Sequence, residues 1–444
     1  MHIINYNKKQ YEVFMFIHIV KPGDTVYNIA ARYNISPSRL IIENDISNPD
    51  HLVVNDALII LQPKQMHLVG PGETLDMIAA LYDIDIMQIL RNNPNVSERG
   101  LIPGEDIVIS YYEDSNRPML SINGFAFTYI DRAVLRKGLP YLTYITIMYY
   151  RVLIDGTLID LDDEEIIQIS KSYGVAPILS VSVLDENSQF DPKSLHTILN
   201  SEQIQLTLIE NLFSIVRQKG YYGINVDIQY VLPADRDAYF RFAEKLLRRF
   251  NNANYKVFVT ITPTTFEMTT RIEYEDINYK GLSEVTNKII YLMTYDFYNP
   301  TESLKATLPF DMLMESAERV LSQVPIEIFD LGYSNVGFIW TLPITSLTEL
   351  RFINITNAVE LAYEVGAEIS YNETTRAAYF IYIFNGQENI VWYRDVRFNE
   401  SIIEEIKYLN IQGITFWNLM CFLPRIFMMY NVNFDIKKID LLDW

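Results

Sequence analysis

The stretch from Gly223 to Tyr230 carries the residue types that point most directly to chemistry. Apolar and polar residues alternate along it, which is the pattern of a β-strand with two distinct faces. One face is polar, at Asn225, Asp227 and Gln229, and three polar groups on an inner strand face are costly to bury unless they are used. A carboxylate can orient a ligand, but an amide cannot deliver a proton to a leaving group. The stretch therefore predicts a polar binding site in which Gln229 decides whether catalysis follows.

The elements that must position this site are apolar segments separated by helical stretches. We expect eight strands, at Leu120–Phe127, Tyr144–Tyr149, Ala176–Val183, Gly223–Tyr230, Val257–Thr262, Ile289–Tyr295, Ile326–Leu331 and Gly413–Trp417. Eight strands alternating with helices indicate a (β/α)8 barrel, an α/β fold. Functional residues of this fold lie at the C-terminal ends of the strands, which is where the sequence places Gln229, Tyr295, Asp296 and Trp417.

A long stretch separates the seventh expected strand from the eighth. Within it, two apolar segments, 378–382 and 390–395, flank a polar turn. They predict a hairpin-bearing α+β insertion at about 340–403, which would wall one side of a cleft.

The N-terminal part of the chain contains an internal repeat. Pro22-Gly23-Asp24-Thr25 recurs as Pro71-Gly72-Glu73-Thr74, and Asn44 recurs as Asn93, each pair 49 positions apart (72 minus 23, 93 minus 44). Each copy reads as a short strand, a Pro-Gly turn, a helix capped by Thr25 or Thr74, a second helix and a closing strand. The predicted organisation is an N-terminal extension at 1–15, two βααβ modules at 16–63 and 64–112, and a barrel at 117–436.

Composition and charge exclude several functions. The formal net charge of -20 argues against nucleic acid, whose phosphates are held by clustered Lys and Arg, and against an anionic membrane surface. No apolar run approaches the ~18 residues of a membrane span, and no conventional signal peptide is expected. Cys421 is the only cysteine, so no internal disulfide can form, and the barrel has one histidine, His196. We therefore expect no metal site and no cofactor, and any barrel chemistry must use carboxylates, tyrosines and amides.

The repeated module resembles LysM, which binds N-acetylglucosamine polymers such as peptidoglycan and chitin. The resemblance covers 16–62 and 66–110 through P-G-[DE]-T, the I-A-A helix and the distal Asn. It implies a sugar groove between the first turn and the loop after the second helix. The groove residues would be Gly23, Asp24, Thr25, Asn44 and Ile46 in the first copy and Gly72, Glu73, Thr74, Asn93 and Asn95 in the second. Thr25 and Thr74 are equally well explained as simple helix caps.

The strand around Asp227 resembles the active-site strand of glycoside hydrolase family 18, D-G-x-D-x-D-x-E, in which the last Glu is the catalytic acid. These positions are Tyr222, Gly223, Asn225, Asp227 and Gln229 here. The likeness runs from about 16 to 436 and extends to LysM-bearing glycosidases of bacterial spores that act on cortex peptidoglycan. The further stretches that resemble these glycosidases are 139–144, 174–178, 219–223, 293–295, 340–343, 391–393 and 416–417.

That resemblance implies substrate-assisted retaining hydrolysis, in which the 2-acetamido oxygen of the sugar attacks its own anomeric carbon. Asp227 would orient the acetamido group, Tyr295 would hydrogen-bond its oxygen, Asp296 would contact the sugar, and Trp417 would form the floor. Asn225 and Phe125 would be further substrate contacts. Tyr222 in place of the first Asp, and the lack of an acidic residue in 332–340, are two further departures from the family pattern.

Gln229 occupies the place of the acid, and loss of general acid–base catalysis costs ~10²–10⁴-fold in rate. One hypothesis is a glycan-binding protein with an inactivated barrel. A second is a slow N-acetylglucosaminidase, or an acid-to-amide variant of one that traps substrate, and a third is a structural coat component. The expected partner is peptidoglycan or a chitin-like glycan, the expected state is a monomer, and the resemblance implies a spore surface or cell-wall location.

An acidic run, Asp160 to Glu165, lies at an expected helix start. Negative charge there is favourable for the helix dipole. We expect these residues to cap the helix and to have no catalytic role.

Overall fold

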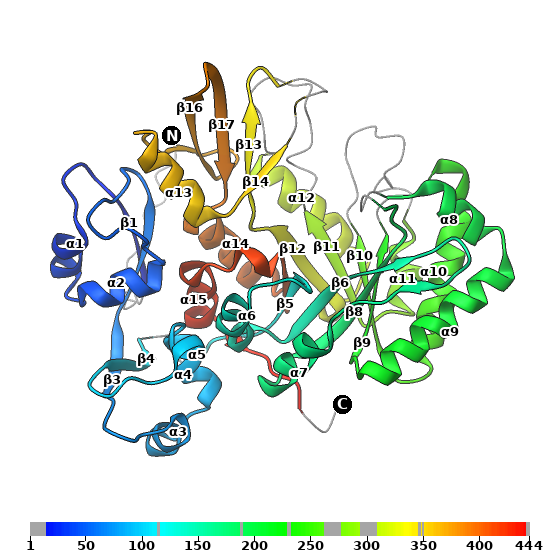
Figure 1. Cartoon of the computed structure of the whole chain (residues 1–444), viewed down its shortest axis with the longest axis horizontal. Coiled ribbons are helices and arrows are strands. Elements are labelled where there is room, and N and C mark those ends of the chain that lie inside the picture. Colours follow the sequence, from blue (N-terminus) through cyan, green and yellow to red (C-terminus); the bar gives the residue numbers. More distant parts are fainter. Residues whose placement is uncertain are drawn as a thin grey trace.

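Eight parallel strands close into a barrel within the part of the chain that the structure describes (Figure 1). The structure is a computed structural model, and it describes residues 15–112, 116–186, 190–228, 232–261, 277–293, 309–344, 348 and 350–440. Around the barrel the strands are β5 (Met119–Phe127), β6 (Tyr144–Val152), β8 (Ala176–Ser182), β9 (Gly223–Ile228), β10 (Lys256–Ile261), β11 (Lys288–Met293), β12 (Phe329–Ser334) and β18 (Gly413–Trp417). Pairing of β5 with both β6 and β18 closes the ring, so the predicted (β/α)8 barrel is confirmed.

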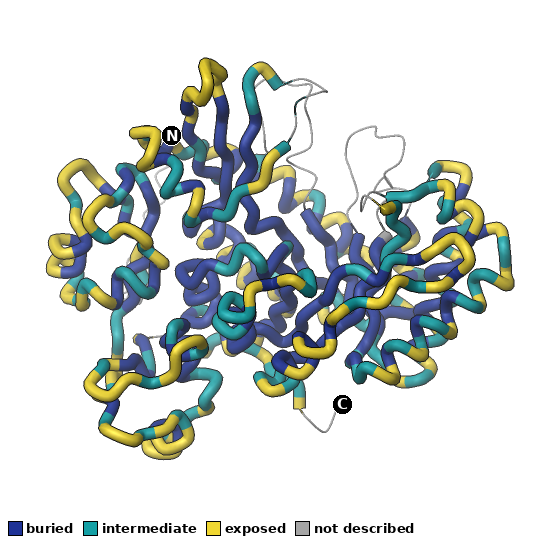
Figure 2. Tube along the Cα trace, in the orientation of Figure 1, coloured by how far each residue is buried: buried dark blue, intermediate teal, exposed yellow. Residues whose placement is uncertain are grey.

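Helices cover the outside of the barrel and connect the strands. They are α6 (Arg132–Gly138), α7 (Glu164–Ser172), α8 (Pro192–Leu199), α9 (Glu202–Lys219), α10 (Arg236–Asn251), α11 (Tyr279–Ser283), α12 (Phe310–Leu321), α14 (Val396–Leu409) and α15 (Pro424–Asn433). The strands are buried on both faces and most helices on their inner faces, whereas α15 is buried on all sides (Figure 2). No helix among the described residues is long and apolar enough to cross a bilayer.

Two expectations about local structure need correction. The seventh strand begins at Phe329, because Ile326–Ile328 forms a 3-10 helix after Pro325. Asp163 occupies the N-cap position of α7 but makes no side-chain capping bond. Its buried carboxylate instead accepts hydrogen bonds from Tyr150, Tyr221 and Lys219, so it joins β6 to the end of α9.

The insertion is a five-stranded antiparallel sheet with one helix, at the top of Figure 1. Its elements are β13 (Gly337–Thr341), β14 (Arg351–Ile353), α13 (Ile355–Glu364), β15 (Ser370–Asn372), β16 (Ala377–Phe384) and β17 (Gln387–Tyr393). The expected hairpin is β16 and β17, in register from Ala378 opposite Tyr393 to Phe384 opposite Gln387. Residues 396–403 belong to the barrel helix α14, so the insertion ends earlier than expected.

The two N-terminal modules share one fold. The first comprises β1 (Met15–Ile19), α1 (Val26–Tyr33), α2 (Pro37–Asn44) and β2 (Ala57–Leu61). The second comprises β3 (Pro63–Leu68), α3 (Leu75–Tyr82), α4 (Ile86–Asn92), a short α5 (Val96–Arg99) and β4 (Asp106–Tyr111). Thr25 and Thr74 cap the first helix of each module, as predicted.

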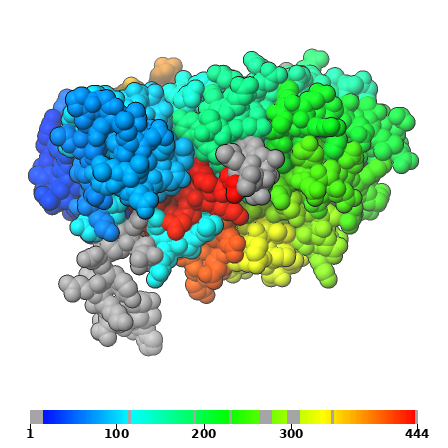
Figure 3. All heavy atoms as spheres, turned by 90° about the horizontal axis from the view of Figure 1, so that it is seen from below, coloured from blue at the N-terminus to red at the C-terminus, as the bar shows by residue number. Residues whose placement is uncertain are grey.

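The modules are docked onto the barrel rather than strung on a linker. Arg39 of α2 bonds Glu43 on its own helix and Asn93 of the second module, at 2.9 and 3.1 Å. The second module in turn bonds α15, through Arg91 to Asn431 at 3.0 Å. Seen from below, the C-terminal segment lies between the modules and the barrel (Figure 3). There the half-buried Lys438 donates to the Leu142 carbonyl at 2.7 Å.

Candidate functional site

The interior of the barrel contains a polar layer formed by neighbouring strands. Asn225 of β9 donates to Ser180 of β8 at 3.2 Å and accepts from Thr260 of β10 at 2.9 Å. All three residues are buried. Because its amide is used by these two hydroxyl groups, Asn225 has a structural role in holding three strands together, and the predicted sugar contact gains no support from this geometry.

Asp227 lies two residues after Asn225, closer to the C-terminal end of β9. Its side chain therefore points to the same face of the strand as that of Asn225. Its side chain is nearly buried, and the hydroxyl of Tyr149 donates to its Oδ2 at 3.5 Å. Tyr239 of α10 donates to the backbone carbonyl of Asp227 at 2.6 Å, which fixes the strand end. Burial, and then the charge of Asp227, raise the pKa of the Tyr239 hydroxyl, so it remains a donor.

Trp417 ends β18, four strands away from β9 and therefore across the barrel. Its partly buried ring packs on the apolar cluster inside the barrel, which also contains Phe125 and is lined by Tyr149. Asp227 and Trp417 thus lie at the C-terminal ends of opposite strands, and Tyr149, which bonds Asp227, packs against the same apolar cluster as Trp417. Phe125 itself is only 2% exposed, so it supports the floor and does not face a ligand here.

Three predicted site residues, Gln229, Tyr295 and Asp296, lie outside the described residues. Their roles remain those implied by the sequence. Tyr222, the departure at the first motif position, lies before β9 at the opposite, N-terminal end of the barrel, with its ring 6.3 Å from Tyr144. That substitution is therefore remote from Asp227.

The predicted sugar ligands of the modules make bonds within each module. Asn44 donates to the carbonyls of Leu40 and Ile59 and accepts from the Ile59 N–H. Asn93 repeats the pattern with Ile89 and Val108. Both side chains are buried, so these asparagines have a structural role within each module, and the predicted sugar contact gains no support from this geometry.

The first turn of each module remains accessible. Gly23 and Gly72 adopt left-handed backbone, with φ of 84° and 77°, and no atom lies within 4 Å of a Cβ placed there. Asp24 and Glu73 accept hydrogen bonds from His18 and His67 at 2.8 and 2.7 Å. Their oxygens are partly used by these bonds, so the carboxylates shape the turn whether or not a sugar is bound.

Sequence reasoning missed Tyr149 and Tyr239, the two tyrosines that hold Asp227. Tyr149 ends the second expected strand and carried the same strand-end signal as Trp417. Tyr239 lies on a helix, and nothing in its local pattern indicates that it reaches β9. Within the described ranges, no three His, Cys, Asp or Glu side chains are grouped to hold a metal ion.

Comparison with known proteins defines the class. Residues 109–420 match glycosyl hydrolases family 18, and residues 18–61 and 67–110 each match the LysM domain. The family match covers more than half of the chain. The chain therefore belongs to glycosyl hydrolase family 18 and carries two LysM domains.

Its relatives share the whole architecture. The cortical fragment-lytic enzyme of Bacillus subtilis (strain 168) is 29% identical over 436 residues, which span 96% of this chain and 99% of the relative. The putative sporulation-specific glycosylase YdhD of the same organism is 26% identical over 96% of this chain and 100% of its own length. The crystal structure of the Bacillus megaterium QM B1551 spore cortex-lytic enzyme SleL superposes with a TM-score of 0.77 at 25% identity, over 96% of this chain and 100% of that one.

Proposed function

We propose that this protein binds N-acetylglucosamine-containing wall glycan of the spore cortex type and hydrolyses it weakly or not at all. The observation that carries the proposal is the amide of Gln229, two positions after Asp227 in the sequence. An amide donates hydrogen bonds, but it can neither protonate a leaving oxygen nor deprotonate a water. The glycan class is supported by the relatives that are named cortical fragment-lytic enzymes and match nearly the whole chain.

The barrel rim supports the binding part of the proposal. Asp227 is held by Tyr149 and, through its backbone, by Tyr239, while Trp417 presents part of its ring at the same rim. A carboxylate opposite an aromatic ring is suited to a hexosamine, whose polar edge and apolar face need both. Two LysM domains add avidity, because each linked site raises the effective concentration at the others.

A second candidate function is an active retaining, substrate-assisted N-acetylglucosaminidase, or an acid-to-amide variant of one. The firmly held Asp227 favours it, because a carboxylate that orients the acetamido group is needed for that chemistry. For this function, a residue other than Gln229 would have to act as the general acid that protonates the leaving oxygen. The two candidates agree on binding and differ on turnover.

Calorimetry with chitotetraose tests binding. We expect the intact chain to bind, and Trp417→Ala to weaken the barrel site about tenfold, because the aromatic floor is lost. Tyr408→Ala is the matched control, since Tyr408 lies on α14 and is 78% exposed. No heat of binding for the intact chain, or equal losses in both variants, would contradict the proposal.

A further inference from the structure

A cavity of about 430 Å³ lies at the N-terminal end of the barrel strands. It is lined by Ser121 near the start of β5, Lys288 at the start of β11 and Gln412 just before β18. Trp417 ends the same β18, so the cavity lies at the end of the barrel opposite to the proposed glycan site. Figure 3 shows this side of the molecule, where α14 in orange adjoins the C-terminal segment in red.

The wall of the cavity contains a lysine that is mostly buried and held in place. Its Nζ, in Lys288, donates to Asp330 Oδ1 at 2.6 Å and to Ser121 Oγ at 3.2 Å. The Ser121 hydroxyl in turn donates to the Gln412 carbonyl at 3.0 Å. An ammonium group has three N–H donors, and among the described residues the third donor of Lys288 has no partner. Because the Lys288 side chain is 10% exposed and lines the cavity, this donor is open to a ligand.

Close packing fixes the position of this ion pair. A Cβ at Gly413 would lie 1.7 Å from Asp330 Oδ1 and 2.9 Å from Lys288 Nζ, so only glycine leaves room for the pair. Side chains without free space around them keep one arrangement. The donor is therefore preformed, as ligand sites usually are.

Two further lysines lie at the mouth of the cavity. Lys407 is in the last turn of α14, where it offsets the helix dipole, and its Nζ donates to Asn433 at 2.7 Å. Lys437 is exposed. Burial raises the pKa of Asp330, and the charges of Lys288 and then Lys437 oppose this rise, which places Lys437 close to the buried pair.

The cavity has a surplus of positive charge, although the chain has a formal net charge of -20. Three lysines line it against one carboxylate, that of Glu327. Asp330 lies behind the wall and neutralises Lys288, so three positive charges face two negative ones and one positive charge is left over. A ligand with a single negative charge balances this site, whereas a cation or a phosphate dianion does not.

The rest of the lining is largely apolar. Ile406, Ile411 and Phe434 are buried residues that contribute to the wall, and Met119 at the start of β5 is 62% exposed. Apolar surface around a few placed polar groups is typical of sites for small organic molecules, and the volume of this cavity is in their usual range.

We propose that this cavity binds a small organic carboxylate with an apolar body. Lys288 and Lys437 hold its carboxylate, and Ile411, Phe434 and Met119 pack against its apolar part. The inference goes beyond the proposed function and does not depend on it, because the two sites lie at opposite ends of the barrel. Barrels of this fold carry their active sites at the C-terminal ends of the strands, so this would be a second, separate ligand site.

Methyl NMR of the full chain, labelled with ¹³C at the methionine methyl groups, tests the proposal because Met119 lines the cavity. The probe is hexanoate. We expect it to shift the Met119 signal saturably, with a Kd of about 1 mM for a ligand of this size. The signal of Met312, which is 50% exposed on α12, should not move. Hexanamide has the same apolar body without the charge and should bind about tenfold more weakly.

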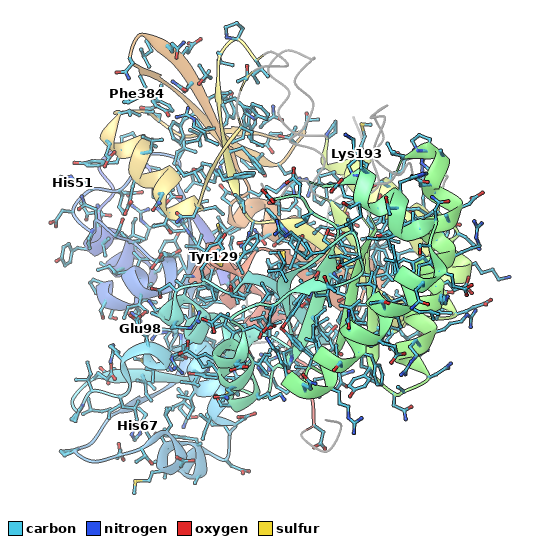
Figure 4. All side chains as sticks on the ribbon, turned by 45° about the vertical axis from the view of Figure 1, so that its right-hand side comes forward. His51, His67, Glu98, Tyr129, Lys193 and Phe384 are labelled. Carbon is cyan, nitrogen blue, oxygen red and sulfur yellow. The ribbon has the colours of Figure 1, made fainter. Side chains whose placement is uncertain are left out.

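Variants locate the site. Lys437→Ala should weaken hexanoate binding about threefold to fivefold, because one exposed charge is lost. Lys193→Ala is the matched control, since Figure 4 shows Lys193 on α8, at the upper side of the barrel and away from the cavity. Gln412→Trp fills the cavity from an exposed position, so it should abolish the hexanoate-induced shift of Met119 without loading the core.

Each outcome decides for or against the site. A saturable Met119 shift that is weakened in Lys437→Ala, abolished in Gln412→Trp and kept in Lys193→Ala supports it. No Met119 shift with hexanoate, an equal shift with hexanamide, or equal weakening in Lys193→Ala overturns it. Tighter binding of pentyl phosphate, mostly a dianion above about pH 7, also overturns it. Chitotetraose should leave the Met119 signal unchanged, so a failure of glycan binding would count against the proposed function alone.

Discussion

In the first LysM domain His18 lies between Tyr33 and Asp24, and in the second His67 lies between Tyr82 and Glu73. The same backbone bonds are made by Asn44 and Asn93. These shared bonds stabilise each module from within. The outward-facing residues differ, because each module has a different neighbour.

The residues that dock the modules occupy matched positions with different chemistry. Arg39 and Glu43 of α2 face the second module, and their counterparts Gln88 and Asn92 of α4 face Asn431 of α15. At the first interface an ion pair within α2 bonds the second module, through Arg39 to Asn93 and through Glu43 to Tyr111. At the second interface the matched positions are amides, which bond Asn431 beside Arg91. The residues that the two copies share determine the fold of each module. The residues that differ between the copies determine where each module docks.

The largest effect should come from breaking the ion pair. Arg39→Ala leaves the fully buried Glu43 without its partner, and we expect a loss of about 3–5 kcal/mol in the opening free energy of the modules. Gln88→Ala removes hydrogen bonds to Asn92 and to the Arg91 guanidinium but leaves no carboxylate without a counter-charge, and it should cost about 1.5–3 kcal/mol. Hydrogen exchange of the amides in α2 and α4 measures the opening free energy of each module separately. A local measurement is needed because a multidomain chain need not unfold in a single step. Arg39→Met with Glu43→Met should recover most of the loss, and equal losses in the two single variants would contradict the difference.

A smaller effect should appear in acid. Burial alone would raise the pKa of Asp24, but hydrogen bonds from the Lys21 N–H and His18, and the charge of Arg32, lower it. The Gly70 N–H and then His67 lower the pKa of Glu73. A carboxyl group with a lowered folded pKa stabilises the fold above its unfolded pKa, and this contribution is lost as the pH falls through the folded value.

The matched variants are Asp24→Asn and Glu73→Gln. Each should make module stability less dependent on pH between about pH 5 and pH 3, by at most about one proton taken up on unfolding. Asp24→Asn should have the larger effect, because the Asp24 side chain is 6% exposed and that of Glu73 is 32% exposed. Arg32, 3.2 Å from Asp24, has Leu81 at the matched position of the second module. The free energy of unfolding, measured at about pH 5 and pH 3 for the parent chain and each variant, checks this prediction. A steeper pH dependence in either variant than in the parent chain would contradict it.

Periodicity and repetition predicted the architecture because those signals are local. The eight strands, the βααβ modules and the caps at Thr25 and Thr74 follow from alternation, fixed spacing and residue preference. The β16–β17 hairpin was found in the same way.

Long-range pairing was not predictable in this way. Tyr239 reaches Asp227 from a helix, and Tyr111, the last residue of β4, is buried against Arg39 and Glu43. The burial of Asn44 and Asn93 was missed because an Asn at a helix end is equally compatible with a ligand contact.

The central claim is that this barrel holds glycan but lacks the acid needed to cleave it. Release of reducing sugar ends from purified spore cortex, by the chain as it stands and by Gln229→Glu, tests the claim most directly. We expect little release by the unaltered chain and a gain of about 10²-fold or more on restoring the carboxylic acid. Rapid release by the unaltered chain, not increased by Gln229→Glu, would contradict the account.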